Sequence, residues 1–197
     1  GEGESESARR IKTEFLVQMQ GVGKQHDGIL VLGATNVPWG LDPAMRRRFE
    51  KRIYIALPEV KARAYMMKLH LGQTPNSLTG DNFNQLAALA EGYSGSDISV
   101  VVREALMEPL RRCQIAQFFR KIKDPESTVG HWYMPCDSNS PGAEKKTLME
   151  VGSEELKCPD VTMQDFLTII NRGGGATVSP SELVQFVKWT EMFGQEG

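Results

Sequence analysis

The 197-residue sequence has no long apolar run and contains few cysteines and histidines. No stretch approaches the roughly 20 consecutive apolar residues that a membrane-spanning helix needs. Its three cysteines, Cys113, Cys136 and Cys158, form no C-x-x-C pair, which favours a reducing compartment over a disulfide framework or a zinc site. The three histidines are scattered as well, so we expect no metal site. A net charge of −2 gives no general reason to expect nucleic-acid binding.

A further absence concerns phosphate binding. No G-x-x-x-x-G-K-[ST] motif occurs, and no apolar run ends in Asp-Glu. The backbone cradle for phosphates and the usual magnesium ligand are therefore missing from these 197 residues. We expect this chain by itself to bind and hydrolyse no ATP.

The most informative stretch that is present is Gly28–Phe49, GILVLGATNVPWGLDPAMRRRF. Its continuous apolar run, Ile29–Leu32, predicts a strand buried on both faces of a parallel sheet. Asn36 follows that strand, at the end of an α/β sheet where ligands bind. Arg46–Arg48 come next, and arginines fixed on a short turn there suit the stabilisation of phosphoryl-transfer charge. The alternative is an ordinary solvated basic turn.

The remaining pattern predicts several helices and a few further strands. Helical spacing predicts helices at Val60–Leu71 and Asp81–Ala90, and capping residues predict further helices that follow Ser7, Ser94, Thr162 and Ser179. Apolar and β-branched residues predict a second strand at Lys51–Leu57. Short β-like runs at His131–Met134 and Lys146–Val151 flank a Ser/Pro/Gly turn and predict a small antiparallel insertion; a disordered loop is the alternative.

GATN and LDPAMRRRFEKRIYI resemble the sensor-1 strand and the second region of homology of AAA ATPases. The chain is most similar to the Vps4-type members of the meiotic clade, because it has the insertion and ends in FGQEG. The resemblance, together with the missing motifs and the start without Met, implies the C-terminal part of a longer ATPase, beginning just past its Walker B strand.

This resemblance implies an α/β fold made of the C-terminal half of an AAA+ large subdomain, a small helical lid subdomain with a short β insertion, and a C-terminal helix. Residues 1–58 would be the partial large subdomain, with the second pore loop near Gly1–Ser7. Residues 59–123 would be the helical subdomain and 124–159 the β insertion. Residues 160–197 would complete the small subdomain and carry the last helix, which packs near the arginine loop in the family.

The resemblance also implies roles for individual residues. Arg47 and Arg48 match the arginine fingers, which reach into the neighbouring protomer's ATP site, and Arg46 matches less clearly and is a candidate salt-bridge residue. Asn36 matches sensor 1, which orients the attacking water or contacts the γ-phosphate. Gly95 and Ser96, in GYSGSD, match the lid residues that contact the adenine. The cofactors would be ATP and Mg²⁺, bound mainly by residues absent from this chain, which has no metal site of its own.

The activity implied by the resemblance is ATP hydrolysis coupled to disassembly of ESCRT-III polymers in endosomal sorting and membrane scission. The enzyme would be a hexamer, with a Vta1/LIP5-type cofactor at the β insertion and no nucleic-acid partner. It would be cytoplasmic, recruited to endosomal membranes only through its partners. The alternatives are a katanin- or spastin-like microtubule-severing ATPase and a non-enzymatic protein-interaction module.

Overall fold

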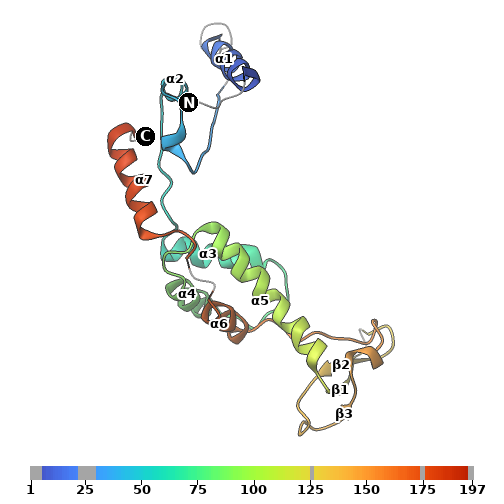
Figure 1. The fold of residues 1–197 in the computed structure, drawn as a ribbon. Coiled ribbons are helices and arrows are strands. Elements are labelled where there is room, and N and C mark those ends of the chain that lie inside the picture. Colours follow the sequence, from blue (N-terminus) through green and yellow to red (C-terminus); the bar gives the residue numbers. More distant parts are fainter. Residues whose placement is uncertain (1–5, 22–29, 125–126, 174–175, 195–197) are drawn as a thin grey trace. The chain divides into compact units, whose positions relative to one another are not determined.

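The computed structural model describes residues 6–21, 30–124, 127–173 and 176–194 (Figure 1). Among these residues, no helix has the length and apolar character needed to cross a bilayer. Parts of two predicted features lie outside the described residues: the pore-loop segment at 1–5 and the terminal residues 195–197. The elements in chain order are α1 (Glu6–Gly21), η1 (Pro38–Gly40), α2 (Pro43–Arg46), α3 (Val60–Leu71), α4 (Gly80–Leu89), α5 (Gly95–Ile115), β1 (Phe118–Lys123), β2 (His131–Pro135), β3 (Ala143–Lys145), η2 (Leu148–Glu150), α6 (Met163–Asn171) and α7 (Pro180–Phe193).

The chain divides into two compact units. The first unit combines Gly1–Ala56 with Ser179–Gly197, and the second is Leu57–Val178. The last helix therefore groups with the N-terminal part of the chain.

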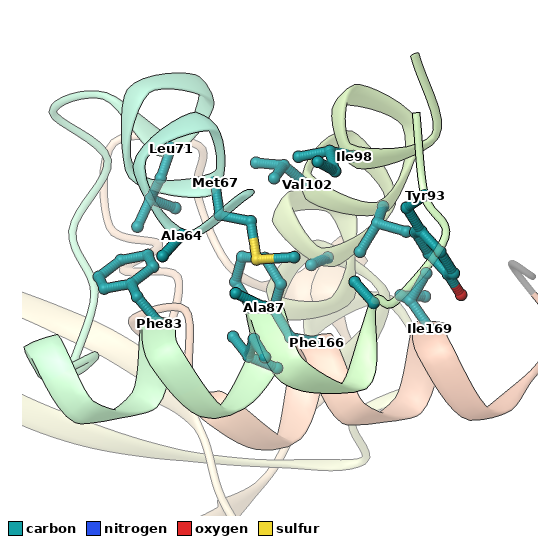
Figure 2. Packing of buried hydrophobic residues seen from close by; sticks show 14 of the residues in the cluster. Ala64, Met67, Leu71, Phe83, Ala87, Tyr93, Ile98, Val102, Phe166 and Ile169 are labelled. Atoms are coloured by element: carbon teal, nitrogen blue, oxygen red, sulfur yellow. The ribbon is translucent and has the colours of Figure 1, made fainter. Parts of the chain in front are cut away.

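Four helices, α3, α4, α5 and α6, form the body of the second unit around one apolar core. Figure 2 shows side chains from all four helices meeting in this core, with Met67 between Ala87 and Val102. The buried positions recur at helical spacing, as in Phe83, Leu86 and Ala87 of α4, so the predicted helices are confirmed. Phe166 of α6 is completely buried in this core.

Local polar groups decide where these helices begin and end. Thr79 and Asn82 form a capping box at the start of α4. Gly72 follows α3 with a φ of 58°, a left-handed conformation that glycine adopts without steric cost. Pro109 lies inside α5 and is buried, and it has no backbone N–H to donate to the helical hydrogen bonding.

A three-stranded antiparallel sheet with the order β2-β1-β3 follows the C-terminal end of α5 (Figure 1). Lys121 pairs with Tyr133 across β1 and β2, and Phe119 pairs with Glu144 across β1 and β3. Phe119, Tyr133 and Val151 form its small core. The predicted β insertion therefore exists, but its first strand begins at Phe118, within the segment that the sequence assigned to the helical subdomain.

The prediction of a β-like run at Lys146–Val151 is wrong. This segment holds the 3₁₀ turn η2, and Val151 is buried beside the sheet without being part of a strand. The Glu150 carboxylate accepts hydrogen bonds from the backbone N–H and the hydroxyl of Thr147, at 2.7 and 2.9 Å. Such local side-chain bonds compete with the pairing of a strand and favour a turn.

The two strands predicted in the first unit are not formed among the described residues. Residue 29 lies outside the description, and residues 30–36 and 51–57 have no strand assignment. The side chains of Leu30, Leu32 and Ile55 are 87%, 88% and 88% exposed. A strand needs a hydrogen-bonded neighbour. Because no described segment pairs with either run, neither run forms a strand in spite of its apolar residues.

Helix α7 completes the first unit by packing against η1. Ser179 caps it, since the Ser179 hydroxyl accepts from the backbone N–H of Glu182 at 3.3 Å, and the Glu182 carboxylate accepts from the Ser179 N–H at 2.8 Å. The Phe186 ring lies 5.0 Å from the Trp39 ring and 6.2 Å from the Tyr54 ring. The predicted packing of the last helix near the arginine loop is thereby confirmed.

Candidate functional site

The arginine turn is built by a short helix that Asp42 caps. Asp42 Oδ1 accepts a hydrogen bond from the backbone N–H of Ala44 at 2.7 Å, and Pro43 occupies the first helical position of α2. Lys12 of α1 forms an ion pair with Asp42 at 2.7 Å. The hydrogen bond from Lys12 and then that from Ala44 lower the pKa of Asp42 below its usual value. Asp42 is therefore charged at neutral pH, and its bonds to Lys12 and Ala44 hold the start of the turn.

Two nearby arginines are held by the last helix. The Arg46 guanidinium lies 3.8 Å above the centre of the Phe193 ring, a cation–π contact. Arg52 donates from Nε to the Phe193 carbonyl and from Nη1 to the carbonyls of Arg46 and Phe49. Among the described residues Arg46 forms no ion pair, so its predicted salt-bridge role is replaced by this contact with α7.

The next two arginines of the run, Arg47 and Arg48, make no such contact with α7. Arg47 and Arg48 are exposed, although hydrogen bonds from their backbone N–H groups to the carbonyls of Pro43 and Met45 hold the turn, at 3.1 and 3.0 Å. Within the described part of the chain, neither guanidinium has a hydrogen-bond or ion-pair partner. Two adjacent guanidinium groups on a capped turn can bind a phosphate-type anion supplied from outside this unit.

Asn36 belongs to the same unit and is also exposed, at a bend just before η1. The hydroxyl of the preceding Thr35 accepts a hydrogen bond from the backbone N–H of Val37 at 3.0 Å and shapes this bend. Gly33 lies close to Phe49, since a Cβ at Gly33 would be 3.2 Å from its ring. The segment that carries Asn36 thus contacts the residue that follows Arg48.

Gly95 and Ser96 lie in the other unit, at the start of α5. Asp97 is buried there, and its carboxylate accepts hydrogen bonds from the backbone N–H and the hydroxyl of Ser94, both at 2.8 Å. It also accepts from the hydroxyl of Thr177, 80 residues later, at 2.8 Å. Sequence reasoning found the Ser94 cap but missed Thr177, because no local pattern connects the two positions.

The Asp97 carboxylate is charged at neutral pH in spite of its burial. Burial alone raises its pKa, but the hydrogen bonds from Ser94 and Thr177 together outweigh this effect and lower it below the usual value. Burial and the Asp97 charge in turn raise the pKa of Tyr93. Asp97 thus ties the chain before α7 to the helix start that carries Gly95 and Ser96.

We expect Asp97→Asn to destabilise the chain by about 1–3 kcal/mol at neutral pH, because an amide cannot accept all the hydrogen bonds made to two carboxylate oxygens. The lowered pKa stabilises the fold above the unfolded value of about 3.9, and this contribution is lost as pH falls through the folded value. The difference in the free energy of unfolding between wild type and variant should therefore become smaller at acidic pH. Urea unfolding at about pH 7 and about pH 3 measures it.

Asp81→Asn is the matched control, since Asp81 is an exposed acid in the first turn of α4. It should change stability by only about 0.3–1 kcal/mol, the scale of a helix-dipole interaction. A gap for Asp97→Asn that stays the same at both pH values would contradict the assigned charge state.

Three segments of the chain match known protein families. Residues 1–57 match the "ATPase family associated with various cellular activities (AAA)", residues 80–118 the "AAA+ lid domain" and residues 133–194 the "Vps4 C terminal oligomerisation domain". Vacuolar protein sorting-associated protein 4B of Mus musculus is 54% identical over 201 residues, which are 100% of this chain and 45% of that protein. The chain belongs to the Vps4 branch of the AAA ATPases.

Relatives outside the Vps4 branch are less similar. Spastin of Danio rerio is 34% identical over 194 residues, 98% of this chain and 28% of that protein. The crystal structure of the FIGL-1 AAA domain superposes with a TM-score of 0.72 at 34% identity, covering 96% of this chain and 53% of the other. This chain spans less than half the length of the two curated relatives. The predicted AAA+ fold class is confirmed, while the roles of Asn36, Arg47, Arg48, Gly95 and Ser96 stay predictions.

Proposed function

We propose that this Vps4-branch chain supplies the arginine fingers, the sensor and the lid of an ATPase that disassembles ESCRT-III polymers. The different environments of the arginines are the main support for this proposal. Helix α7 contacts Arg46 and Arg52, whereas Arg47 and Arg48 are exposed on the capped turn. The 197 residues contain no phosphate loop, so the anion for these two side chains must come from elsewhere. ATP bound to the neighbouring protomer of a ring is that anion.

The other predicted residues act on the nucleotide of their own protomer. Asn36 orients the attacking water or contacts the γ-phosphate, and Gly95 and Ser96 contact the adenine. ATP and Mg²⁺ are held mainly by residues outside this chain. Residues 1–58 act as part of the large subdomain, and residues 59–123 act as the helical lid. Residues 124–159 form the β insertion, and residues 160–197 complete the lid and carry the C-terminal helix. Strands of the large subdomain would cover the exposed side chains of Leu30, Leu32, Ile53 and Ile55.

The proposed assembly is a hexamer, and the match to a Vps4 oligomerisation family over residues 133–194 supports self-association. The sheet formed by β1, β2 and β3 is the proposed site of a Vta1/LIP5-type cofactor. ESCRT-III subunits are the substrate, and the protein acts in the cytoplasm, recruited to endosomal membranes through its partners. It uses no nucleic acid.

Two observations favour this function over a katanin- or spastin-like microtubule-severing activity. Identity is 54% to the mouse protein but 34% to spastin over almost the same span. The match to the Vps4 oligomerisation family also covers the segment from β2 to α7. A purely structural interaction module would have no need for two exposed arginines on a capped turn that lack a hydrogen-bond or ion-pair partner among the described residues.

A chimera tests the proposal directly. In it, this chain replaces the 201 matching residues of mouse vacuolar protein sorting-associated protein 4B, and ATP turnover is measured. We expect the chimera to hydrolyse ATP and to release subunits from ESCRT-III polymers, while the isolated chain shows no ATP binding in calorimetry. A chimera that folds and binds ATP without turning it over would refute the proposal, and micromolar ATP binding by the isolated chain would reveal a phosphate site elsewhere.

A further inference from the structure

Two of the cysteines are in contact within the second unit. Cys113 lies in the last turn of α5 and is 1% exposed, and Cys158, 45 residues later, is half-buried in the segment before α6. The Cys113 thiol donates to the Cys158 sulfur over an Sγ–Sγ distance of 3.9 Å. A disulfide has an S–S distance of about 2.0 Å, so the two sulfurs must approach by about 2 Å for a bond to form.

The backbone on both sides of Cys158 is held in place. The N–H of Lys157 donates to the Tyr133 carbonyl at 3.0 Å, and the N–H of Val161 donates to the Pro75 carbonyl at 3.1 Å. From the α5 side, Arg112 donates to the Asp160 carbonyl at 3.4 Å. Because its neighbours are fixed, Cys158 stays beside Cys113, and a reaction between them has the advantage of an intramolecular one.

Arg112 adds a stronger connection close to Cys113. It forms an ion pair with Asp165 at 3.0 Å, and the Asp165 side chain is nearly buried. Asp165 also accepts from the backbone N–H of Thr162 at 2.7 Å. Arg112 therefore joins the end of α5 to the start of α6 next to Cys113.

We propose that Cys113 and Cys158 form a site of reversible oxidation, which hydrogen peroxide converts into an intramolecular disulfide. The two thiols lose two electrons and two protons, and one peroxide molecule takes them up to become two water molecules. The proposal is independent of the ATPase function proposed above, since it depends only on geometry within Leu57–Val178. In a reducing compartment such a bond would form transiently under oxidative load.

The environments of the two sulfurs set the order of steps. Burial, together with the Cys158 sulfur, raises the pKa of the Cys113 thiol to about 12, so Cys113 keeps its proton at neutral pH. The more accessible Cys158 is the first nucleophile: its thiolate attacks a peroxide oxygen, the O–O bond breaks, and a sulfenic acid and hydroxide result. The Cys113 sulfur then attacks the Cys158 sulfur, the S–O bond breaks, and the departing hydroxide takes the thiol proton as water.

The disulfide would close a loop that contains the entire three-stranded sheet. Phe118–Lys145, the span from β1 to β3, lies between Cys113 and Cys158. A cross-link of this kind stabilises a protein mainly by restricting its unfolded chain. Oxidation should therefore raise the unfolding temperature by on the order of 5 °C or more.

The test exposes the native chain to hydrogen peroxide, removes the excess with catalase, and alkylates the remaining thiols in denaturant. We expect the intact mass before alkylation to fall by about 2 Da, because a disulfide has two hydrogens fewer. The number of alkylated cysteines should fall from three to one, and a proteolytic map should join the peptides of Cys113 and Cys158. Dithiothreitol should restore all three thiols.

Cys136→Ser is the matched control, since Cys136 directly follows β2 and has no sulfur neighbour among the described residues. This variant should still lose about 2 Da and both of its thiols on oxidation. Cys158→Ser should keep its mass and both of its thiols on oxidation, so its Cys113 should remain alkylatable. Three alkylatable thiols in oxidised wild type, a disulfide through Cys136, or a covalent dimer would each overturn the proposal, even if Cys158→Ser did not fold.

Discussion

Arg47→Ala and Arg48→Ala are each expected to lower ATP turnover of the mouse chimera by roughly 10³–10⁵, the range known for arginine fingers. The expected result is a loss of turnover with ATP affinity nearly unchanged. A finger stabilises the charge that develops on the transferred phosphoryl group, and this charge is greatest in the transition state. Both side chains are exposed on the turn after α2, so removing them breaks no side-chain hydrogen bond or ion pair within the described chain.

Two control variants separate the chemistry from folding. Arg103→Ala removes another exposed arginine, on α5, and should leave turnover unchanged. Arg46→Ala removes the cation–π contact with Phe193 and should mainly lower stability, by about 0.5–1 kcal/mol. Unfolding curves and steady-state kinetics measured on the same preparations distinguish the two effects.

A mixing experiment tests whether the fingers act across the ring. Chimeras carrying Arg47→Ala are mixed with chimeras whose phosphate loop no longer binds ATP. If Arg47 serves the neighbour's ATP, some interfaces in mixed rings contain one intact finger and one intact nucleotide site, and part of the turnover returns. If turnover is unchanged by Arg47→Ala alone, or if mixing restores nothing, the assignment as a finger acting in trans is wrong.

Phe166→Ala is expected to lower the free energy of unfolding of the helical unit by about 3–5 kcal/mol. The Phe166 side chain is completely buried in the core formed by α3, α4, α5 and α6, and the truncation removes its contacts and leaves a cavity (Figure 2). Globular domains are stable by only about 5–15 kcal/mol, so this one change removes a large part of the total. Urea unfolding followed by far-UV circular dichroism measures the shift.

Leu69→Ala is the matched control, because Leu69 lies on α3 with 62% of its side chain exposed. It should cost at most about 0.5 kcal/mol, as is usual for a surface substitution. If Phe166→Ala and Leu69→Ala destabilised the chain equally, the four-helix core would not be the main source of stability in this unit.

The amino-acid sequence determined the helices of this protein and its family. The helix starts at Ser94, Thr162 and Ser179 were predictable because caps and apolar spacing depend on residues three or four positions apart. The short motif around Asn36 and Arg46–Arg48 was enough to place the chain among the AAA ATPases, which the relatives confirm. Motifs of this kind are local, so they can be recognised without the fold.

Other features depended on where distant parts of the chain meet. The strand pattern of Ile29–Leu32 was clear, yet a strand forms only beside a hydrogen-bonded neighbour, and no described segment provides one. The sequence distinguished Arg46 from Arg47 and Arg48 only by resemblance to a family. The contact that holds Arg46 depends on Phe193, which lies far along the chain.

Two contacts within the second unit make the same distinction. Asp97 and Thr177 are 80 residues apart, and Cys113 and Cys158 are 45 apart. The spacing of the cysteines argued against a disulfide, yet the folded chain brings two of the thiols together. Helical periodicity and capping are properties of neighbouring residues, whereas these contacts depend on the path of the whole chain. The sequence by itself therefore determined the helices and the family, and only the tertiary structure decided which side chains are held, which are exposed and which can react.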